Sequence, residues 1–259
     1  MIKPKVCILR SAGTNCDKET AAAFSLAGAD TELLHINSLV SAKRTLDDFH
    51  ILAFPGGFSY GDDVASGKIF ANELRFKLVD SLHKFTSAGK LIIGICNGFQ
   101  ILVKSGLLPQ GRELQQNTSL IINDSGKFED RWTYLRPGGK CIWTKGLKQI
   151  IYLPVAHGEG KFVTLDKKVL NRLKVNKQII FQYCDCDGKL SGYPYNPNGS
   201  EENIAGITDT TGRILGLMPH PERHIFSMQH PRNWNLGPKK YGDGLAIFKN
   251  GVDFIKKNF

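Results

Sequence analysis

The stretch LIIGICNGFQIL, residues 91–102, sets a single cysteine, Cys96, between two glycines where an apolar run ends. The run Leu91 to Ile95 is short, apolar and partly β-branched, which is typical of a fully buried strand. Residues 99–104 have a helical pattern, and a Ser-Gly pair follows as a helix stop. We therefore expect Cys96 on a strand-to-helix turn, where small neighbours allow the strained conformation of a nucleophile. A buried structural cysteine is the alternative interpretation, and the motif alone leaves both open.

The residues before Cys96 alternate between expected strands and expected helices. The strands are expected at Lys5 to Leu9, Thr31 to Ile36, Phe49 to Phe54 and Leu91 to Ile95, and the helices at Asp17 to Leu26 and Val64 to Ser87. This alternation predicts an α/β fold with a doubly wound parallel sheet. Such sheets carry their active groups at the carboxyl ends of the strands, and Cys96 stands at one of these ends.

The second half of the chain has a different pattern, in which strands are separated by turns. Strands are expected at Ile150 to Val155, Phe162 to Leu165, Gln178 to Cys186, Ile204 to Thr208 and Ile214 to Met218, with a closing helix at Phe248 to Phe254. Residues 187–203, rich in Asn, Pro and Gly, are expected to form a loop. The sequence shows no repeat, low-complexity segment or linker, so residues 1–259 are predicted to form one domain with additional antiparallel strands.

Composition and charge narrow the class of protein. The 259 residues are 41% hydrophobic and 22% charged, which suffices for a substantial core. Six cysteines form no short paired framework, and the basic N-terminus has too short an apolar core for a signal peptide, so we expect a cytoplasmic protein. No apolar stretch approaches ~18 residues, so no membrane contact is expected. The net charge of +10 comes from scattered residues, which favours a solvated basic surface over nucleic-acid binding.

A thiol nucleophile needs a base, and two histidines stand at expected strand ends as Cys96 does. These are His157 in YLPVAHGEG and His220 in ILGLMPHPERH. Prolines on both sides stiffen the segment around His220, and Glu222 lies two residues further on, on the same side of an extended chain. Cys96, His220 and Glu222 are therefore candidates for the nucleophile, the base and the group that orients the base. Without Cys96, a turn histidine between prolines would be the better interpretation of His220.

Attack by a thiolate on a carbonyl creates an oxyanion, which needs hydrogen-bond donors already in place. The backbone N–H of Asn97 is one candidate, and the glycine-rich segment PGGFSYGDD offers the N–H of Gly57 or Phe58. A plain turn is the alternative interpretation of that segment. Asp62 and Asp63, which follow in it, are expected to cap the long helix.

Two patterns that resemble ligand sites fail on spacing. The stretch GDDVASGKI, residues 61–69, has five residues between its glycines and no Ser or Thr after Lys68, so it does not match the phosphate-loop pattern. The pair Cys184 and Cys186 lies in an expected strand without a matching second pair, so we expect no metal site.

Four motifs together resemble one known family, the class I (triad) glutamine amidotransferases. They are PGGFSYGDD (55–63), GICNGFQ (94–100), AHGEG (156–160) and PHPERH (219–224), and the resemblance covers nearly the whole chain. Within the family, the chain is most similar to the glutaminase subunits of phosphoribosylformylglycinamidine synthases. The resemblance implies the flavodoxin-like doubly wound fold of the class, a glutaminase with no cofactor of its own, and Gln100, His157 and Gly158 as candidate substrate-binding residues.

The chemistry that this resemblance implies begins with attack of Cys96 on the side-chain amide of L-glutamine. Ammonia leaves, a γ-glutamyl thioester forms, His220 moves the protons, Glu222 orients it, and water releases glutamate. The ammonia would pass to a PurL-type synthetase subunit, with or without a small PurS-type subunit. That partner would use ATP and Mg to amidate formylglycinamide ribonucleotide in de novo purine biosynthesis. What residues 107–150 and 187–203 contact is not indicated by the sequence.

Two rival interpretations share the fold. One is a cysteine hydrolase or deglycase that works alone, for which the PHPE sequence is not expected. The other is a non-enzymatic, flavodoxin-like module that senses redox state through Cys96. Glutamine turnover with and without a synthetase partner separates the three.

Overall fold

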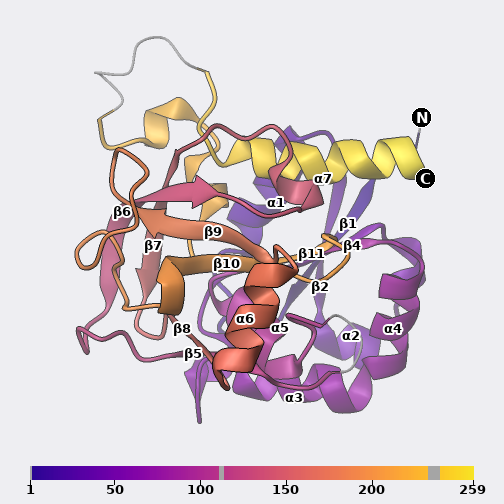
Figure 1. Ribbon diagram of the computed structural model, residues 1–259. Coiled ribbons are helices and arrows are strands. Elements are labelled where there is room, and N and C mark those ends of the chain that lie inside the picture. The colour runs from indigo at the N-terminus through magenta and orange to yellow at the C-terminus, as the bar shows by residue number, and fades with distance from the viewer. Residues whose placement is uncertain (1, 111–113, 233–239) are drawn as a thin grey trace.

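A computed structural model describes residues 2–110, 114–232 and 240–259 and shows a nine-stranded mixed sheet between two layers of helices (Figure 1). The strand order is β2-β1-β3-β4-β11-β10-β9-β6-β7. The first five strands in this order are parallel: β2 (Asp30–His35), β1 (Lys5–Arg10), β3 (Ile51–Phe54), β4 (Leu91–Ile95) and β11 (Ile214–Leu217). All residues of β3, β4 and β11 are buried, because helices cover both faces and leave no side to solvent.

In the described ranges, seven α-helices connect and cover the strands: α1 (Asp17–Leu26), α2 (Ile36–Val40), α3 (Lys68–Lys77), α4 (Val79–Ser87), α5 (Asn97–Ser105), α6 (Lys167–Val175) and α7 (Leu245–Asn258). Helix α7 packs beside α1, and α3 packs beside α5 on the other side of the sheet (Figure 1). The chain runs from β1 toward β2 at one edge, whereas β3 leads to β4 in the opposite direction. The predicted doubly wound fold is confirmed, and its topological switch point lies between β1 and β3.

Antiparallel strands extend the sheet beyond β11, as the second half of the sequence predicts. They are β10 (Ile204–Thr208), β9 (Ile179–Cys184), β6 (Glu129–Pro137) and β7 (Ile151–His157). A separate two-stranded sheet pairs β5 (Thr118–Ile121) with β8 (Lys161–Thr164). Strands β5 and β6 lie in the 107–150 region, for which the sequence indicated no element. The 187–203 segment consists mainly of turns, as expected, and ends in a short 3₁₀ helix at Glu201–Asn203.

The single long helix predicted at Val64 to Ser87 is wrong. The structure divides it into α3 and α4 at Leu78, where φ is −127°, and α3 begins only after Gly67, which takes a left-handed conformation. Asp62 and Asp63 therefore do not cap it. Asp62 lies instead in a 3₁₀ segment, Ser59–Asp62, and its Oδ2 accepts a hydrogen bond from Ser66 Oγ at 2.9 Å.

The other described 3₁₀ segments are Leu46–Asp48, Ile142–Thr144, Pro221–His224 and Ser227–Gln229. Among the described residues, no helix is both long enough and apolar enough to cross a membrane.

Candidate active site

Cys96 occupies the turn between β4 and α5, with φ of 52° and ψ of −107°. A positive φ is strained for a residue with a Cβ atom, and such strain gathers at functional sites. The flanking glycines allow the helix to lie directly on the strands. A Cβ atom at Gly98 would lie 2.0 Å from the carbonyl oxygen of Phe54, and one at Gly94 would lie 2.6 Å from that of Gly98. The strand-to-helix turn that the sequence predicts is therefore present, and its glycines are required by close backbone approach.

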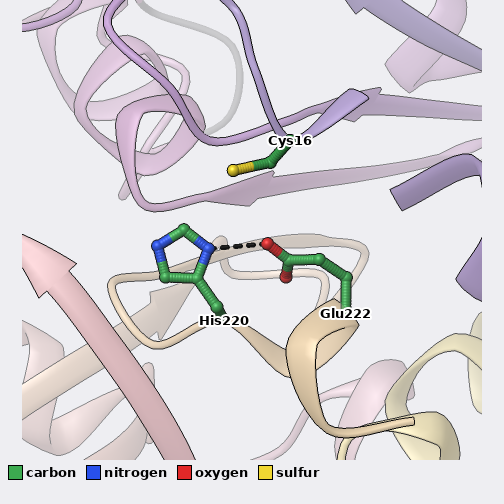
Figure 2. Close-up of side chains that lie close together, drawn as sticks. All are labelled: Cys16, His220 and Glu222. Atoms are coloured by element: carbon green, nitrogen blue, oxygen red, sulfur yellow. Dashed lines mark hydrogen bonds and ion pairs between the residues drawn. The ribbon is translucent and has the colours of Figure 1, made fainter. Parts of the chain in front are cut away.

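His220 reaches Cys96 because the strands that carry the two residues are neighbours. Strand β11 pairs with β4 in parallel, and Leu217 stands opposite Ile95, so both chains leave the same edge of the sheet. The Cys96 N–H donates to the Leu217 carbonyl oxygen at 2.8 Å. Figure 2 shows the His220 ring beside Glu222, with Nδ1 of the ring 2.6 Å from Oε1 of the carboxylate. The contact that the sequence predicts is thus present, but the extended geometry is wrong, because Glu222 lies in the 3₁₀ segment Pro221–His224.

The environment of His220 favours its protonated form. Burial alone would lower the pKa of this imidazole, but the Glu222 carboxylate and the Cys96 thiol outweigh burial and hold the pKa well above 6.5. The Glu222 carboxylate accepts the Nδ1 hydrogen bond, which leaves Nε2 for the reaction. Nε2 is buried and makes no hydrogen bond to any of the described residues. The orphaned nitrogen is therefore available to a substrate or to the nucleophile.

His157 is held as a neutral ring by its neighbours. Its Nδ1 lies 3.1 Å from Asn123 Oδ1, an atom that also accepts the Gly160 N–H, so Nδ1 carries the proton. Its Nε2 faces the Asn198 amide nitrogen, which donates to the Gly160 carbonyl oxygen and so presents a donor. Burial, reinforced by the nearby His220 charge, lowers the pKa of His157 to about 4. These contacts support His220, rather than His157, as the base.

Of the three backbone N–H groups that are candidate oxyanion donors, one already donates a hydrogen bond within the protein and two do not. The Phe58 N–H donates to the Gly13 carbonyl oxygen at 2.9 Å, so it is occupied in this conformation. The N–H groups of Gly57 and Asn97 make no hydrogen bond within the described part of the chain. Gly57 has φ of 141°, and a Cβ atom there would lie 2.7 Å from the Asn15 nitrogen, so only glycine fits this turn.

A buried polar network joins the glycine-rich segment, the nucleophile helix and the AHGEG segment. Asn97 Oδ1 accepts the Ser59 N–H at 3.2 Å, and Asn97 Nδ2 donates to Gln100 Oε1 at 2.9 Å. Gln100 Nε2 donates to the Glu159 carbonyl oxygen at 2.7 Å. The candidate substrate-binding residue Gln100 is thus engaged by protein atoms on both sides of its amide. Gly158, the third candidate, uses its carbonyl oxygen to accept the Asn123 N–H.

Lys104 lies beneath this network and is almost fully buried. Its ammonium donates to the Ser66 carbonyl oxygen at 2.6 Å and lies 3.4 Å from Glu159 Oε2. Burial lowers the pKa of Lys104, although the Glu159 carboxylate opposes that shift. Lys104 therefore joins the turn before α3, through Ser66, to the AHGEG segment, through Glu159.

Cys16 is the site residue that the sequence interpretation missed. It follows β1 and lies with its sulfur toward the His220 ring (Figure 2). Arg223 Nη2 donates to Cys16 Sγ at 3.2 Å, and burial raises the pKa of the thiol. The available signal was its position, because Asn15-Cys16-Asp17 comes just after the first predicted strand and so at the same sheet edge as Cys96.

The sequence predicts that the protein has no metal site, and this absence stays a prediction. In the described part of the chain, one group of three side chains offers possible ligand atoms within 4.8 Å of one another: Cys16, His220 and Glu222. Two of the three already bond each other through Nδ1 and Oε1. The group is thus a hydrogen-bonded pair beside a thiol.

The site is closed in this conformation. Cys96 is 5% exposed and His220 2% exposed. Cavities of about 650 Å³ and 410 Å³ lie elsewhere, the first beside Pro137 to Gln149 and the second beside Tyr152 and Tyr241, and neither is lined by Cys96 or His220.

Comparison with known proteins gives concordant matches over the full length. Residues 3–255 match the model of the CobB/CobQ-like glutamine amidotransferase domain. The chain is 50% identical to the phosphoribosylformylglycinamidine synthase subunit PurQ of Dehalococcoides mccartyi, over 99% of this chain and 100% of that protein. It is 45% identical to the PurQ subunit of Methanococcus maripaludis, with the same coverage. A chain in the solved structure of PurLQS from Thermotoga maritima matches with a TM-score of 0.75 and 30% identity, over 98% of this chain and 100% of that chain.

Proposed function

This chain belongs to the CobB/CobQ-like glutamine amidotransferase family, and on that premise we propose that it is the glutaminase subunit of a phosphoribosylformylglycinamidine synthase. It would hydrolyse L-glutamine and supply the ammonia to a separate synthetase subunit in de novo purine biosynthesis. The observation that carries the proposal is the convergence of Cys96, His220 and Glu222 at the carboxyl ends of neighbouring parallel strands, within the matched residues.

The first half of the reaction follows from the strained turn. The Cys96 thiolate attacks the side-chain carbonyl carbon of glutamine, and the negative charge that develops on oxygen is stabilised by the free N–H groups of Gly57 and Asn97. His220, held protonated by Glu222, gives its Nε2 proton to the departing nitrogen. Ammonia leaves and a γ-glutamyl thioester remains on Cys96.

The second half reverses the role of His220. The neutral imidazole takes a proton from water as the water attacks the thioester, and the thiolate is released with glutamate. Glu222 holds Nδ1 throughout, so that Nε2 always faces the reacting atoms. The neutral, hydrogen-bonded His157 would shape the substrate pocket without moving protons.

The partner would be a PurL-type synthetase subunit, with or without a small PurS-type subunit, because the matched chain of known structure comes from a PurLQS structure. ATP and Mg would act in that partner, which would amidate formylglycinamide ribonucleotide. The cytoplasm is the compartment we propose, since all six cysteines are free thiols, which suits a reducing compartment.

We further infer that the isolated chain is a poor glutaminase that its partner activates. Cys96 is nearly buried, and one of the two free oxyanion donors, Gly57, lies in a glycine-rich turn. A partner that binds only the productive conformation raises turnover by at most its preference for that state, so an activation of ~100-fold needs ~2.7 kcal/mol of differential binding.

The experiment is steady-state glutamate release by the isolated chain and then by the chain with synthetase partner, ATP and acceptor substrate. The proposal predicts slow release alone and a large increase on assembly. Equal rates in both conditions would favour a cysteine hydrolase that works alone. No glutamine turnover in either condition would favour the non-enzymatic redox module.

A further inference from the structure

The glutaminase chemistry leaves one buried thiol of the site without a role. Cys16 is 1% exposed and lies at the carboxyl end of β1, whereas Cys96 lies at the carboxyl end of β4. Strand β3 separates β1 from β4 in the sheet, and Gly56 lies two residues beyond the end of β3 at this edge. The two cysteines therefore flank a position that carries no side chain.

Gly56 defines how close the two cysteines are. A Cβ atom built on Gly56 would lie 3.1 Å from Cys16 Sγ and 3.5 Å from Cys96 Cβ. The same atom would lie 2.8 Å from Cε1 of His220, so the imidazole borders the space between the two thiols. Both sulfur atoms also influence the protonation of His220. Cys16 Sγ, Cys96 Cβ and the His220 ring thus all lie within 3.5 Å of one point beside Gly56.

We propose that Cys16 is a resolving cysteine, which forms a reversible disulfide with Cys96 when the nucleophile is oxidised by a peroxide. In the first step, the Cys96 thiolate attacks one oxygen of hydrogen peroxide; the O–O bond breaks, hydroxide leaves, and Cys96 becomes a sulfenic acid. In the second step, the sulfur of Cys16 attacks the sulfenic sulfur, the S–O bond breaks and water leaves. The sum is two thiols plus one peroxide giving one disulfide plus two waters.

The assignment of the two roles follows from the surroundings of each sulfur. Cys96 is on the strained turn that a substrate must reach, and His220, whose pKa is held well above 6.5, lies beside it. Cys16 is buried against Arg223, whose Nη2 lies 3.2 Å from the sulfur and stabilises a thiolate at the moment of attack. His220 gives its Nε2 proton to the hydroxide that leaves in the first step, so the neutral Nε2 can accept the Cys16 proton in the second step and pass it to the departing hydroxyl group.

The consequence is a reversible, peroxide-dependent loss of glutaminase activity. The disulfide removes the nucleophile, so the supply of ammonia stops, and a dithiol restores both thiols by exchange. Without a resolving thiol, the sulfenic acid is exposed to further peroxide and proceeds to sulfinic acid, which a dithiol does not reduce. Cys16 would therefore protect the active site from irreversible oxidation.

The test treats the reduced full-length chain with hydrogen peroxide, blocks the remaining thiols with N-ethylmaleimide, and maps peptides without reduction. We expect one cross-linked species that joins the peptides of Cys16 and Cys96. Glutamate release should be lost in step with its formation, and dithiothreitol should restore the rate to within about two-fold of the untreated value. The activity readout rests on the proposed function, whereas the peptide map does not, so failure of the one is distinguishable from failure of the other.

Matched variants complete the test. In Cys16→Ser, recovery by dithiothreitol, measured against the untreated variant, should fall at least about five-fold, with sulfinic acid accumulating at Cys96. Cys186→Ser removes an exposed thiol outside the site and should behave as the wild type does. The proposal is overturned if wild-type protein gives no Cys16–Cys96 peptide, if another cysteine pair takes up the oxidation, or if Cys16→Ser recovers as fully as the wild type.

Discussion

Glu222→Gln is the substitution that probes the electrostatics of the site most selectively. It keeps the shape of the side chain and removes only the charge that faces His220 Nδ1 at 2.6 Å. Both groups are buried, so water cannot replace the lost carboxylate. An uncompensated charge in such a pair costs about 3–5 kcal/mol. Because the imidazolium form is required in the first half-reaction, we expect glutamate release to fall by about 10²- to 10⁴-fold.

The pH dependence of this variant gives a second, independent readout. In the wild type, the Glu222 carboxylate keeps the proton on His220 to a pH well above 6.5, in spite of burial. In the variant burial dominates, and a buried imidazolium loses its proton at lower pH. The alkaline limb of the kcat/KM profile should therefore move to lower pH, which a general loss of folding would not produce.

The assay is glutamate release by the assembled enzyme over the pH range in which thermal unfolding shows the variant to be folded. Glu202→Gln is the matched control, because Glu202 forms a half-exposed pair with Lys174 and such pairs contribute less than about 1 kcal/mol. Wild-type turnover in Glu222→Gln, or an alkaline limb that stays in place or moves to higher pH, would refute the reasoning.

Two further predictions concern neighbouring residues. The pKa of His157 is about 4 in the fold, below its unfolded value of about 6.5. The free energy of unfolding should therefore decline by up to about 3 kcal/mol as the pH falls between these two values, and His157→Gln should lack this decline in denaturant titrations. If the variant shows the same dependence of stability on pH as the wild type, the neutral ring is contradicted. Gly57→Ala places a Cβ atom 2.7 Å from the Asn15 nitrogen at a φ of 141°. We therefore expect glutaminase activity to fall at least about 100-fold, while ammonia-dependent synthesis by the assembled enzyme persists. Near-normal use of glutamine by the variant would show that Gly57 is not an oxyanion donor.

The parallel half of the fold and the strained turn could be predicted because their signals are local. Short apolar runs such as Leu91 to Ile95 indicate strands buried on both faces, and the spacing of two glycines around Cys96 indicates a close strand-to-helix turn. The break at Leu78 has no such signal. Apolar residues keep helical spacing on both sides of it, and the break arises because α3 packs on α5 while α4 packs on the 46–48 segment. The cause of the break is tertiary packing, which the periodicity of apolar residues along the sequence does not reveal.

The site residues likewise divide into contacts that a local sequence pattern predicts and contacts that depend on the tertiary structure. His220 and Glu222 are two residues apart in sequence, so their contact is local, although Glu222 lies in a 3₁₀ turn rather than in the extended segment that the sequence predicted. Cys16 reaches His220 only through the pairing of distant strands, which no local pattern contains. The Phe58 N–H is likewise taken by the Gly13 carbonyl oxygen in a contact between two loops. Strand ends gather at one edge of a parallel sheet, but which side chains then touch depends on contacts over long sequence distances.

The measurement that tests the central claim most directly compares glutamine and ammonia as nitrogen donors for Cys96→Ala in the assembled enzyme. If Cys96 is the nucleophile and this chain serves to release ammonia, glutamine-dependent synthesis should disappear while ammonia-dependent synthesis by the partner stays at the wild-type rate. Loss of both activities would give Cys96 a structural role, and glutamine-dependent synthesis by the variant would place the nucleophile elsewhere.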